Sequence, residues 1–437
     1  MTRAGRTVAI LSPDFSPSSL PSSIRARLFA THLPEFGWRP VVITTAPKFY
    51  TCPLDTDNNR LLPEDLEVIR TGALPARQMR RFGIGDVGMR SLWHHWTEIG
   101  RLCRARAIDV LLVTVPPSVP MILGRFAWER FGLPYVIDYQ DPWITEVYWN
   151  KPRSERPPKW PLTYALSRLL EPPSIRRASY ITGVSAGTVD GVLERYPQWQ
   201  GLGSSAIPFG AEPADFNFLR QHPRRNPCFE KSDGFVHLVY AGVCIPGMYP
   251  ALRCLFGGLR LLREKHPQLA ARMRLHFVGT NYAASGGAKR AEPIAKEFGV
   301  ADLMNETPGR VSYLDAMQLM LDATGLLIVG TDEPHYVASK VYPYALSGRP
   351  IFAIFHERSS AVEALSSIAP ARIMTFGETR PAEQQTEAAA THLESLANSA
   401  GVPAYTANIP GHTARDMTGR LAHALDRVFA SKVGRQE

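Results

Sequence analysis

Short apolar runs alternate with longer helical patterns along most of the chain. In the first half, each apolar run spans only a few residues and is bounded by polar or turn-forming residues, which is typical of buried parallel strands. These runs occupy residues 8–11, 41–43, 66–69, 110–115, 134–138 and 180–184. Helical patterns separate them, such as the apolar stripe over residues 22–36 that ends at Gly37. Strands that recur between helices predict a parallel, doubly wound α/β sheet.

The same alternation restarts after a polar break. Residues 200–205 are polar and glycine-bearing, and residues 207–210 form a predicted sharp turn. Further apolar runs follow at 236–241, 275–278, 326–329, 351–355 and 373–376. The pattern predicts two Rossmann-like domains, residues 1–206 and 207–412, and a last helix within 413–437 that crosses back to the first domain. Because open parallel sheets bind ligands at the carboxyl ends of their strands, we expect the site between the two domains.

Length, charge and cysteine content narrow the class of protein. A chain of 437 residues is long enough for two domains. A net charge of +9 is compatible with nucleic acid, an anionic membrane surface or acidic substrates. The sequence contains no helix-turn-helix, zinc-finger spacing or RNA-binding motif, so we expect no nucleic-acid partner. The five cysteines form no CxxC pair, which predicts a cytoplasmic protein without disulfides or structural zinc.

The sequence predicts peripheral rather than transmembrane contact with a membrane. No apolar stretch is long enough for a membrane-spanning helix, and the apolar run near the N-terminus is too short for a signal peptide. The segment Arg77–Trp96 combines arginines with aromatic residues, which suits docking on the inner face of the membrane or on a lipid carrier. The alternative is a solvated helix that packs on the sheet through Trp93 and Trp96.

A candidate phosphate site follows the apolar run 325–330. A polar loop, residues 331–335, leads to Ser339 and Lys340 at the start of a short helical segment. A helix start offers unpaired backbone N–H groups and partial positive charge to an anion, and Lys340 would add a full charge. Glu333 and His335 lie in the same loop, at a strand end where ligands bind, and are candidate ligand contacts. The alternative is an ordinary solvated lysine.

A second candidate site follows the apolar run 134–138. Asp141 stands beside Pro142 and Trp143 and could bind a hydroxyl group or act as a general base. Gln140, just before it, could form a hydrogen bond with a sugar hydroxyl. The alternative role for Asp141 is a helix N-cap or an Asx-turn. We expect Asp141 on one wall of the interdomain site and Lys340 on the other.

These motifs, in their order along the chain, resemble the retaining GT-B glycosyltransferases of the family 4 type. The resemblance runs from about Val8 to Pro350. Its segments are the loop and helix 13–33, the strand end 132–143, the strand 178–185, the linker 207–216, the motifs 240–242, 277–280 and 309–311, and the segment 339–350. No single motif is decisive, but this many in the order of the family are specific to the fold.

The resemblance implies a donor half and an acceptor half of one active site. Donor binding is implied for Gly242, Thr280, Val311 (through its backbone), Glu333, His335, Ser339 and Lys340. Phosphate or acceptor contacts are implied for Ser22, Ser23 and Arg25, and catalytic roles for Gln140 and Asp141. The implied reaction is a hexosyltransferase-type transfer from a nucleotide diphosphate sugar to a hydroxyl of a glycan, lipid carrier or small molecule, with retention. No carboxylate cluster suggests a divalent ion, so no metal or other cofactor is expected.

The sequence also departs from the family at several positions. Serines replace the glycine pair of the first loop, and Val243 and Met248 stand where the family commonly has an arginine and a lysine. His335 and Pro343 fall where the family has paired glutamates. These losses motivate an alternative, a non-catalytic GT-B-like partner or regulator of an active enzyme. A further alternative is a nucleotide-sugar epimerase of the same architecture.

Overall fold

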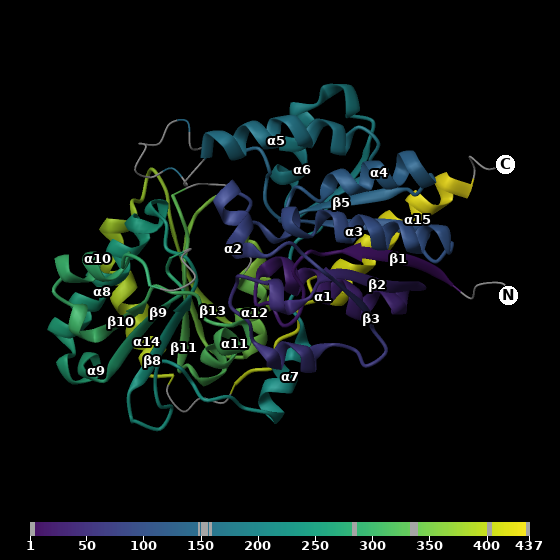
Figure 1. Ribbon diagram of the computed structural model, residues 1–437. Helices are drawn as coiled ribbons and strands as arrows, with labels where there is room; N and C mark the ends of the chain where they lie inside the picture. The colour runs from purple at the N-terminus through teal and green to yellow at the C-terminus, as the bar shows by residue number, and fades with distance from the viewer. Residues whose placement is uncertain are drawn as a thin grey trace. The chain divides into compact units, whose positions relative to one another are not determined.

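A computed structural model describes residues 5–146, 149, 156, 160–281, 286–332, 340–399 and 404–433 of the chain. These residues fold into two compact units. The first unit comprises the chain up to Gly210 together with the segment from Ala414 onward, and the second comprises Ala211–Thr413. Each unit contains one sheet in which all strands run parallel (Figure 1). The sequence prediction of two doubly wound parallel sheets is therefore confirmed.

The first unit is built on a seven-stranded sheet with strand order β3-β2-β1-β4-β5-β6-β7. Its strands are β1 (Arg6–Leu11), β2 (Trp38–Thr45), β3 (Glu67–Thr71), β4 (Val110–Val115), β5 (Tyr135–Tyr139), β6 (Tyr180–Gly183) and β7 (Gly203–Ala206). Its helices are α1 (Pro21–His32), α2 (Ala76–Met79), α3 (Val87–Arg104), α4 (Met121–Phe131), α5 (Trp160–Ile175), α6 (Ala186–Arg195) and α15 (Ala414–Val433).

Both faces of this sheet are buried, which explains why its strands are continuous apolar runs in the sequence. Val8 and Ile10 of β1 pack with residues of α1 and α15, whereas Ala9 and Leu11 pack with residues of α3 and α4. Residues Met417, Leu421 and Leu425 of α15 lie in the same core cluster as Val8. The last helix, yellow in Figure 1, is therefore part of the first unit.

The second unit is built on a six-stranded sheet with strand order β10-β9-β8-β11-β12-β13. Its strands are β8 (Val236–Ala241), β9 (Met273–Val278), β10 (Met304–Thr307), β11 (Gly325–Val329), β12 (Ile351–His356) and β13 (Ala371–Phe376). Its helices are α7 (Pro213–Gln221), α8 (Tyr249–Lys265), α9 (Pro267–Ala271), α10 (Glu292–Glu297), α11 (Tyr313–Asp322), α12 (Val341–Ser347), α13 (Ser360–Ile368) and α14 (Thr386–Ala397).

Close contact between α8 and α14 depends on a glycine. A Cβ atom at Gly258 would lie 2.7 Å from the Cβ of Ala389 and 2.8 Å from the backbone nitrogen of Ala390. The two helices therefore approach nearly backbone to backbone on one face of the second sheet. Within the described residues, every helix is too short or too polar to span a lipid bilayer.

Candidate functional site

In the second unit, Lys340 lies at the carboxyl end of β8. The residue directly precedes α12, and its Nζ lies 5.0 Å from the ring centroid of Tyr240, the penultimate residue of β8. The ammonium also lies directly against Gly242, since a Cβ atom added at that position would lie only 1.1 Å from Nζ. The missing side chain of Gly242 therefore allows Lys340, at the start of α12, to lie across the end of β8.

No described residue acts as a counter-ion for the charge of Lys340. Within the described residues, Lys340 takes part in no ion pair, and no carboxylate influences its pKa. Burial lowers the pKa of Lys340 to about 8, while the nearby Cys244 opposes this shift. A partly desolvated cation without a carboxylate partner is an arrangement that an anionic ligand would stabilise.

The position of α12 is set by a second buried aromatic residue. The backbone N–H of Ala241 donates a hydrogen bond of 2.8 Å to the hydroxyl of Tyr344, a side chain with 0% exposure. This bond ties the middle of α12 to the last residue of β8. Met248, at the position where the family resemblance implies a lysine, is instead packed in the core at 2% exposure. Lys340 thus supplies the positive charge at this strand end.

In the first unit, Asp14 lies just beyond the end of β1 and is 1% exposed. The Ser22 hydroxyl donates a 2.7 Å hydrogen bond to its Oδ2. Its Oδ1 is also buried but has no hydrogen-bond partner in the described structure. Burial raises the pKa of Asp14 to about 6, against the opposing effect of the Ser22 bond, and Asp86 adds to the rise.

Gln140 directly follows β5. In the sheet, β4 lies between β5 and β1. Its side chain is largely buried, and neither its Oε1 nor its Nε2 has a hydrogen-bond partner among the described residues. Buried polar atoms without partners are rare in folded proteins and call for a water or a ligand. Asp14 and Gln140 therefore mark the carboxyl end of the sheet beside the point where the strand order reverses, which is where open α/β sheets bind ligands.

Comparisons with known proteins agree with this geometry. Residues 22–199 match the family model described as "Glycosyl transferase 4-like domain". Residues 22–199 are therefore similar to a glycosyltransferase 4-like domain, and the chain as a whole has a GT-B fold. No curated protein sequence matches the chain at a significant level.

Solved structures match the chain over nearly its whole length. Anabaena HepE in complex with UDP-glucose has 13% identity and a TM-score of 0.53, covering 98% of this chain and 99% of that one. The Burkholderia xenovorans trehalose-phosphate synthase with glucose-6-phosphate has 11% identity and a TM-score of 0.52, covering 99% of each chain. A Listeria monocytogenes protein assigned as a UDP-N-acetylglucosamine 2-epimerase has 12% identity and a TM-score of 0.51, covering 98% of each chain. At these identities the likeness concerns the fold alone.

The structure corrects the predicted role of Arg25 in the first unit. Its Nε and one terminal nitrogen donate to the two carboxylate oxygens of Asp138 at 2.7 and 2.8 Å. The carbonyls of Ile207 and Pro208 accept the remaining bonds at 2.8 and 3.1 Å. Arg25 is 2% exposed, so its guanidinium ties α1 to the end of the first sheet instead of contacting a phosphate or an acceptor.

Thr280 also has a structural role in place of a side-chain contact with a ligand. Its hydroxyl, fully buried, donates a 2.5 Å hydrogen bond to Glu306. The Glu306 carboxylate in turn accepts from the backbone N–H groups of Arg290, Ala291 and Glu292. The Thr280 side chain therefore helps to hold the start of α10, so a donor contact of Thr280 would have to come from its backbone.

The other predicted site residues lie in both units. Ser22 binds Asp14, and Ser23 is buried in the first turn of α1. Asp141 is exposed directly after Gln140. Val311 lies between β10 and α11, next to Ser312, whose hydroxyl caps α11 by accepting a 3.1 Å bond from the Asp315 N–H. Glu333, His335 and Ser339 lie outside the described residues.

Sequence reasoning did not select Asp14 as a site residue. The available signal was an acidic residue shortly after the first buried strand, inside the run Ser12-Pro13-Asp14-Phe15. An aspartate in such a loop usually supports a turn, so the signal is weak. Its burial and its unpartnered Oδ1 became visible only in the folded unit.

The basic and aromatic segment Arg77–Trp96 divides into buried and exposed parts. Arg90 is 1% exposed and donates to the carbonyls of Phe49, Leu74 and Gly85, so it does not contribute to a basic surface. Trp96 packs against Phe126 and Phe131. Phe82 and Trp93 are 77% and 73% exposed, so they are the aromatic residues of this segment that face solvent.

Proposed function

We propose that the chain is a glycosyltransferase that moves a sugar from a nucleotide diphosphate sugar to an acceptor hydroxyl. The observation that carries this proposal is the ammonium of Lys340, which lies over Tyr240 and Gly242 at a strand end of the second unit and forms no ion pair with any described residue. The glycosyltransferase 4-like domain and the GT-B fold support it. The structure of HepE with UDP-glucose supports a nucleotide sugar as the donor.

The second unit would bind the donor through its diphosphate. As the sugar leaves, negative charge builds up on the diphosphate, and a preorganised cation lowers the energy of that transition state. Lys340 is held in place by Gly242 and by the anchoring of α12 through Tyr344, so little reorganisation is needed at the moment of reaction. We propose that Lys340 provides this charge without a metal ion. Retention of the anomeric configuration is the outcome that the family resemblance implies.

The first unit would bind the acceptor through Gln140 and Asp14. The amide of Gln140, which has no hydrogen-bond partner among the described residues, can both donate to and accept from a hydroxyl group. Asp14 has a pKa near 6, so it is largely ionised at neutral pH and could accept a proton from that hydroxyl. Asp141, exposed beside Gln140, is the alternative base. The acceptor class remains a glycan, a lipid carrier or a small molecule, and the trehalose-phosphate synthase with glucose-6-phosphate illustrates the last kind.

The donor half of the proposal is tested by nucleotide-sugar binding. Thermal-shift scans of the purified chain with UDP-, GDP- and dTDP-sugars should show stabilisation by one of them. Lys340→Met should then raise the dissociation constant at least about tenfold, or about 1.4 kcal/mol. Gly242→Ala should weaken binding similarly, because its Cβ would take the place of the ammonium.

Two substitutions serve as matched controls. Lys265→Met removes an exposed lysine from the end of α8, and Gly191→Ala adds a methyl group where nothing lies within 4 Å. Both should leave binding unchanged. If no nucleotide sugar stabilises the protein, the result favours the alternative hypothesis of a non-catalytic GT-B-like module. If a bound nucleotide sugar is converted to its epimer without any acceptor, the epimerase alternative is correct.

We further propose that the protein works in the cytoplasm at the inner face of a membrane. Phe82 and Trp93 expose apolar rings, and Arg77, Arg80 and Arg81 are exposed close to Phe82. Arginines beside exposed aromatic rings suit binding at an anionic lipid surface. Such docking would bring the enzyme to a lipid-linked acceptor.

A further inference from the structure

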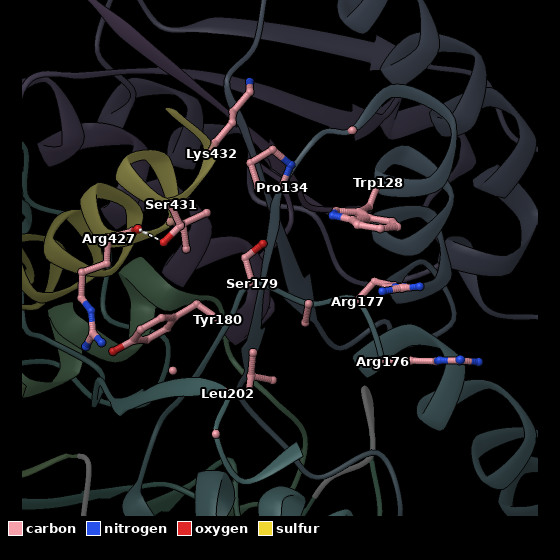
Figure 2. A pocket seen from close by; sticks show the side chains of 15 residues that line it. Trp128, Pro134, Arg176, Arg177, Ser179, Tyr180, Leu202, Arg427, Ser431 and Lys432 are labelled. Atoms are coloured by element: carbon pink, nitrogen blue, oxygen red, sulfur yellow. Dashed lines mark hydrogen bonds between the residues drawn. The ribbon is translucent and has the colours of Figure 1, made fainter. Parts of the chain in front are cut away.

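A cavity lies at the amino ends of three strands of the seven-stranded sheet (Figure 2). Pro134, Ser179 and Leu202 line it, and each stands directly before the first residue of β5, β6 or β7. The cavity is therefore at the amino ends of these strands, whereas Asp14 and Gln140 follow carboxyl ends. Its volume of about 570 Å³ falls in the range of small-molecule sites.

Among the described residues, four cationic side chains and no acidic side chain line this cavity. Arg176 and Arg177 follow the end of α5, and Arg427 and Lys432 belong to α15. None of the four forms an ion pair within the described part of the chain. Elsewhere in the first unit, exposed arginines do find carboxylates, as in Arg39–Glu67 and Arg101–Glu98. Four unpaired like charges around one cavity repel one another, and an anion in the cavity would relieve that repulsion.

Aromatic rings hold two of these cations at the wall. The guanidinium of Arg177 lies 4.5 Å from the ring centroid of Trp128, and that of Arg427 lies 5.6 Å from that of Tyr180. Figure 2 shows these two pairs on either side of Ser179. A guanidinium held over a ring keeps its N–H groups available in its own plane, the geometry that suits bidentate contact with phosphate oxygens.

The Tyr180 ring is itself fixed by the strand next to it. Its hydroxyl donates a 3.0 Å bond to the carbonyl of Ser204. Gly203 leaves room for the ring, since a Cβ atom there would lie 2.6 Å from two of the ring carbons. On the α15 side, Lys432 donates a 3.3 Å bond to the carbonyl of Asp109. The cavity is therefore bounded by side chains with defined positions.

We propose that this cavity is a binding site for a phosphate-bearing anion, with Arg177 and Arg427 as its main contacts. Arg176 and Lys432 add charge at its rim, and Pro134, Leu202 and Trp128 offer apolar surface to an organic group attached to the phosphate. The phosphate can belong to a soluble organic phosphate or to a phospholipid headgroup. This site does not depend on the proposed transfer reaction, because it shares no residue with Lys340, Asp14 or Gln140.

Calorimetric titration with inorganic pyrophosphate tests the site. Every protein in the series carries Lys340→Met, so that binding at the proposed donor site does not contribute. Arg177→Gln with Arg427→Gln should weaken pyrophosphate binding at least tenfold. The matched control, Arg39→Gln with Arg101→Gln, removes the same charge from exposed arginines outside the cavity and should bind as the parent does. An equal loss in the control pair would overturn the proposal, since it would show general charge attraction only.

Vesicle flotation distinguishes the two sources of phosphate. Phosphatidylcholine vesicles with and without phosphatidylglycerol are incubated with the parent and with both pairs of variants. A phospholipid headgroup is the ligand if phosphatidylglycerol increases binding of the parent and of the control pair more than it increases binding of the cavity pair. A soluble phosphate is the ligand if pyrophosphate binds in the cavity while phosphatidylglycerol has no such effect. The proposal is wrong if all proteins unfold at the same temperature and neither pyrophosphate binding nor phosphatidylglycerol binding depends on Arg177 and Arg427.

Discussion

At the scale of single residues, Lys340 combines a fixed position with a charge that can titrate. Its ammonium lies over Tyr240 without a carboxylate partner in the described structure, and burial lowers its pKa to about 8. Only the protonated amine can neutralise a diphosphate. The same burial that makes the charge effective therefore makes it sensitive to pH in a range where an exposed lysine stays charged.

Donor affinity should consequently fall at alkaline pH. Above about pH 8 the protonated fraction of free Lys340 falls, approaching tenfold per pH unit, and the dissociation constant of UDP or of the preferred nucleotide should rise with it. Titrations from about pH 7 to about pH 9.5 measure this. Lys340→Met should bind weakly at every pH and lack the alkaline decline. A decline of the same size in Lys340→Met would assign the titration to another group.

Asp14 is the second residue for which burial has a measurable consequence. Its pKa is raised from 3.8 to about 6, so the folded protein holds a proton that the unfolded chain releases in between. The free energy of unfolding should therefore decrease as pH rises from about 3.8 to about 6, by up to about 3 kcal/mol. Above pH 6 the ionised carboxylate remains a cost to stability.

Asp14→Asn should therefore be more stable than the parent at pH 7, while its transfer activity falls. The amide oxygen can still accept the Ser22 bond, but the side chain can no longer accept a proton. Urea unfolding at about pH 4 and about pH 7 measures the first effect, and turnover measures the second. Asp65→Asn, at an exposed position, is the control and should change neither. Full activity of Asp14→Asn would leave Asp141 as the candidate base.

At the scale of elements, most strands were predictable and two were not. Buried strands such as β4 and β11 are continuous apolar runs, because helices cover both faces of their sheets. β7 (Gly-Ser-Ser-Ala) and β10 (Met-Asn-Glu-Thr) are mostly polar, and each forms one edge of its sheet. A short edge strand pairs through its backbone on one side only, so its side chains carry little apolar signal.

The segment from α2 to α3 presents an element-scale prediction. Phe82→Ser with Trp93→Ser should reduce binding to anionic vesicles at least about tenfold, because two exposed rings lose their burial in the lipid interface. The control pair, Leu162→Ser with Leu169→Ser, removes two apolar side chains that are 63% and 69% exposed on α5. Sedimentation with phosphatidylglycerol vesicles compares the two pairs. Equal losses in both pairs would argue against a docking role for this segment.

At the scale of the whole molecule, the two units have different proposed ligands, the donor for the second unit and the acceptor for the first. A donor that binds Lys340 should stabilise the second unit first. At about one hundred times the dissociation constant, UDP would add about 2.7 kcal/mol to local stability if opening abolishes binding. Hydrogen exchange should therefore slow by up to about a hundredfold at residues 240–244 and 340–345, and little at residues 12–25 and 138–141. Slowing centred on the first unit would place the nucleotide there.

The local pattern of the sequence by itself determined the fold class. Alternating apolar runs and helical stripes specify two parallel sheets, because the apolar strands and the apolar faces of the helices must be buried against one another. The sequence also pointed to Lys340 and Gln140, since both follow strand ends where such sheets bind ligands.

Tertiary structure decided which polar residues are free to act. Arg25 and Thr280 looked like ligand contacts, yet Asp138 and Glu306, far away in the sequence, bind their side chains. Asp14 looked like a loop residue, yet the fold buries it with one oxygen unpartnered in the described structure. The cavity between the end of α5 and α15 is lined by residues about 250 positions apart, so no local sequence pattern predicts it. Hydrogen-bond satisfaction and burial depend on contacts between distant segments, and these exist only once the chain has folded.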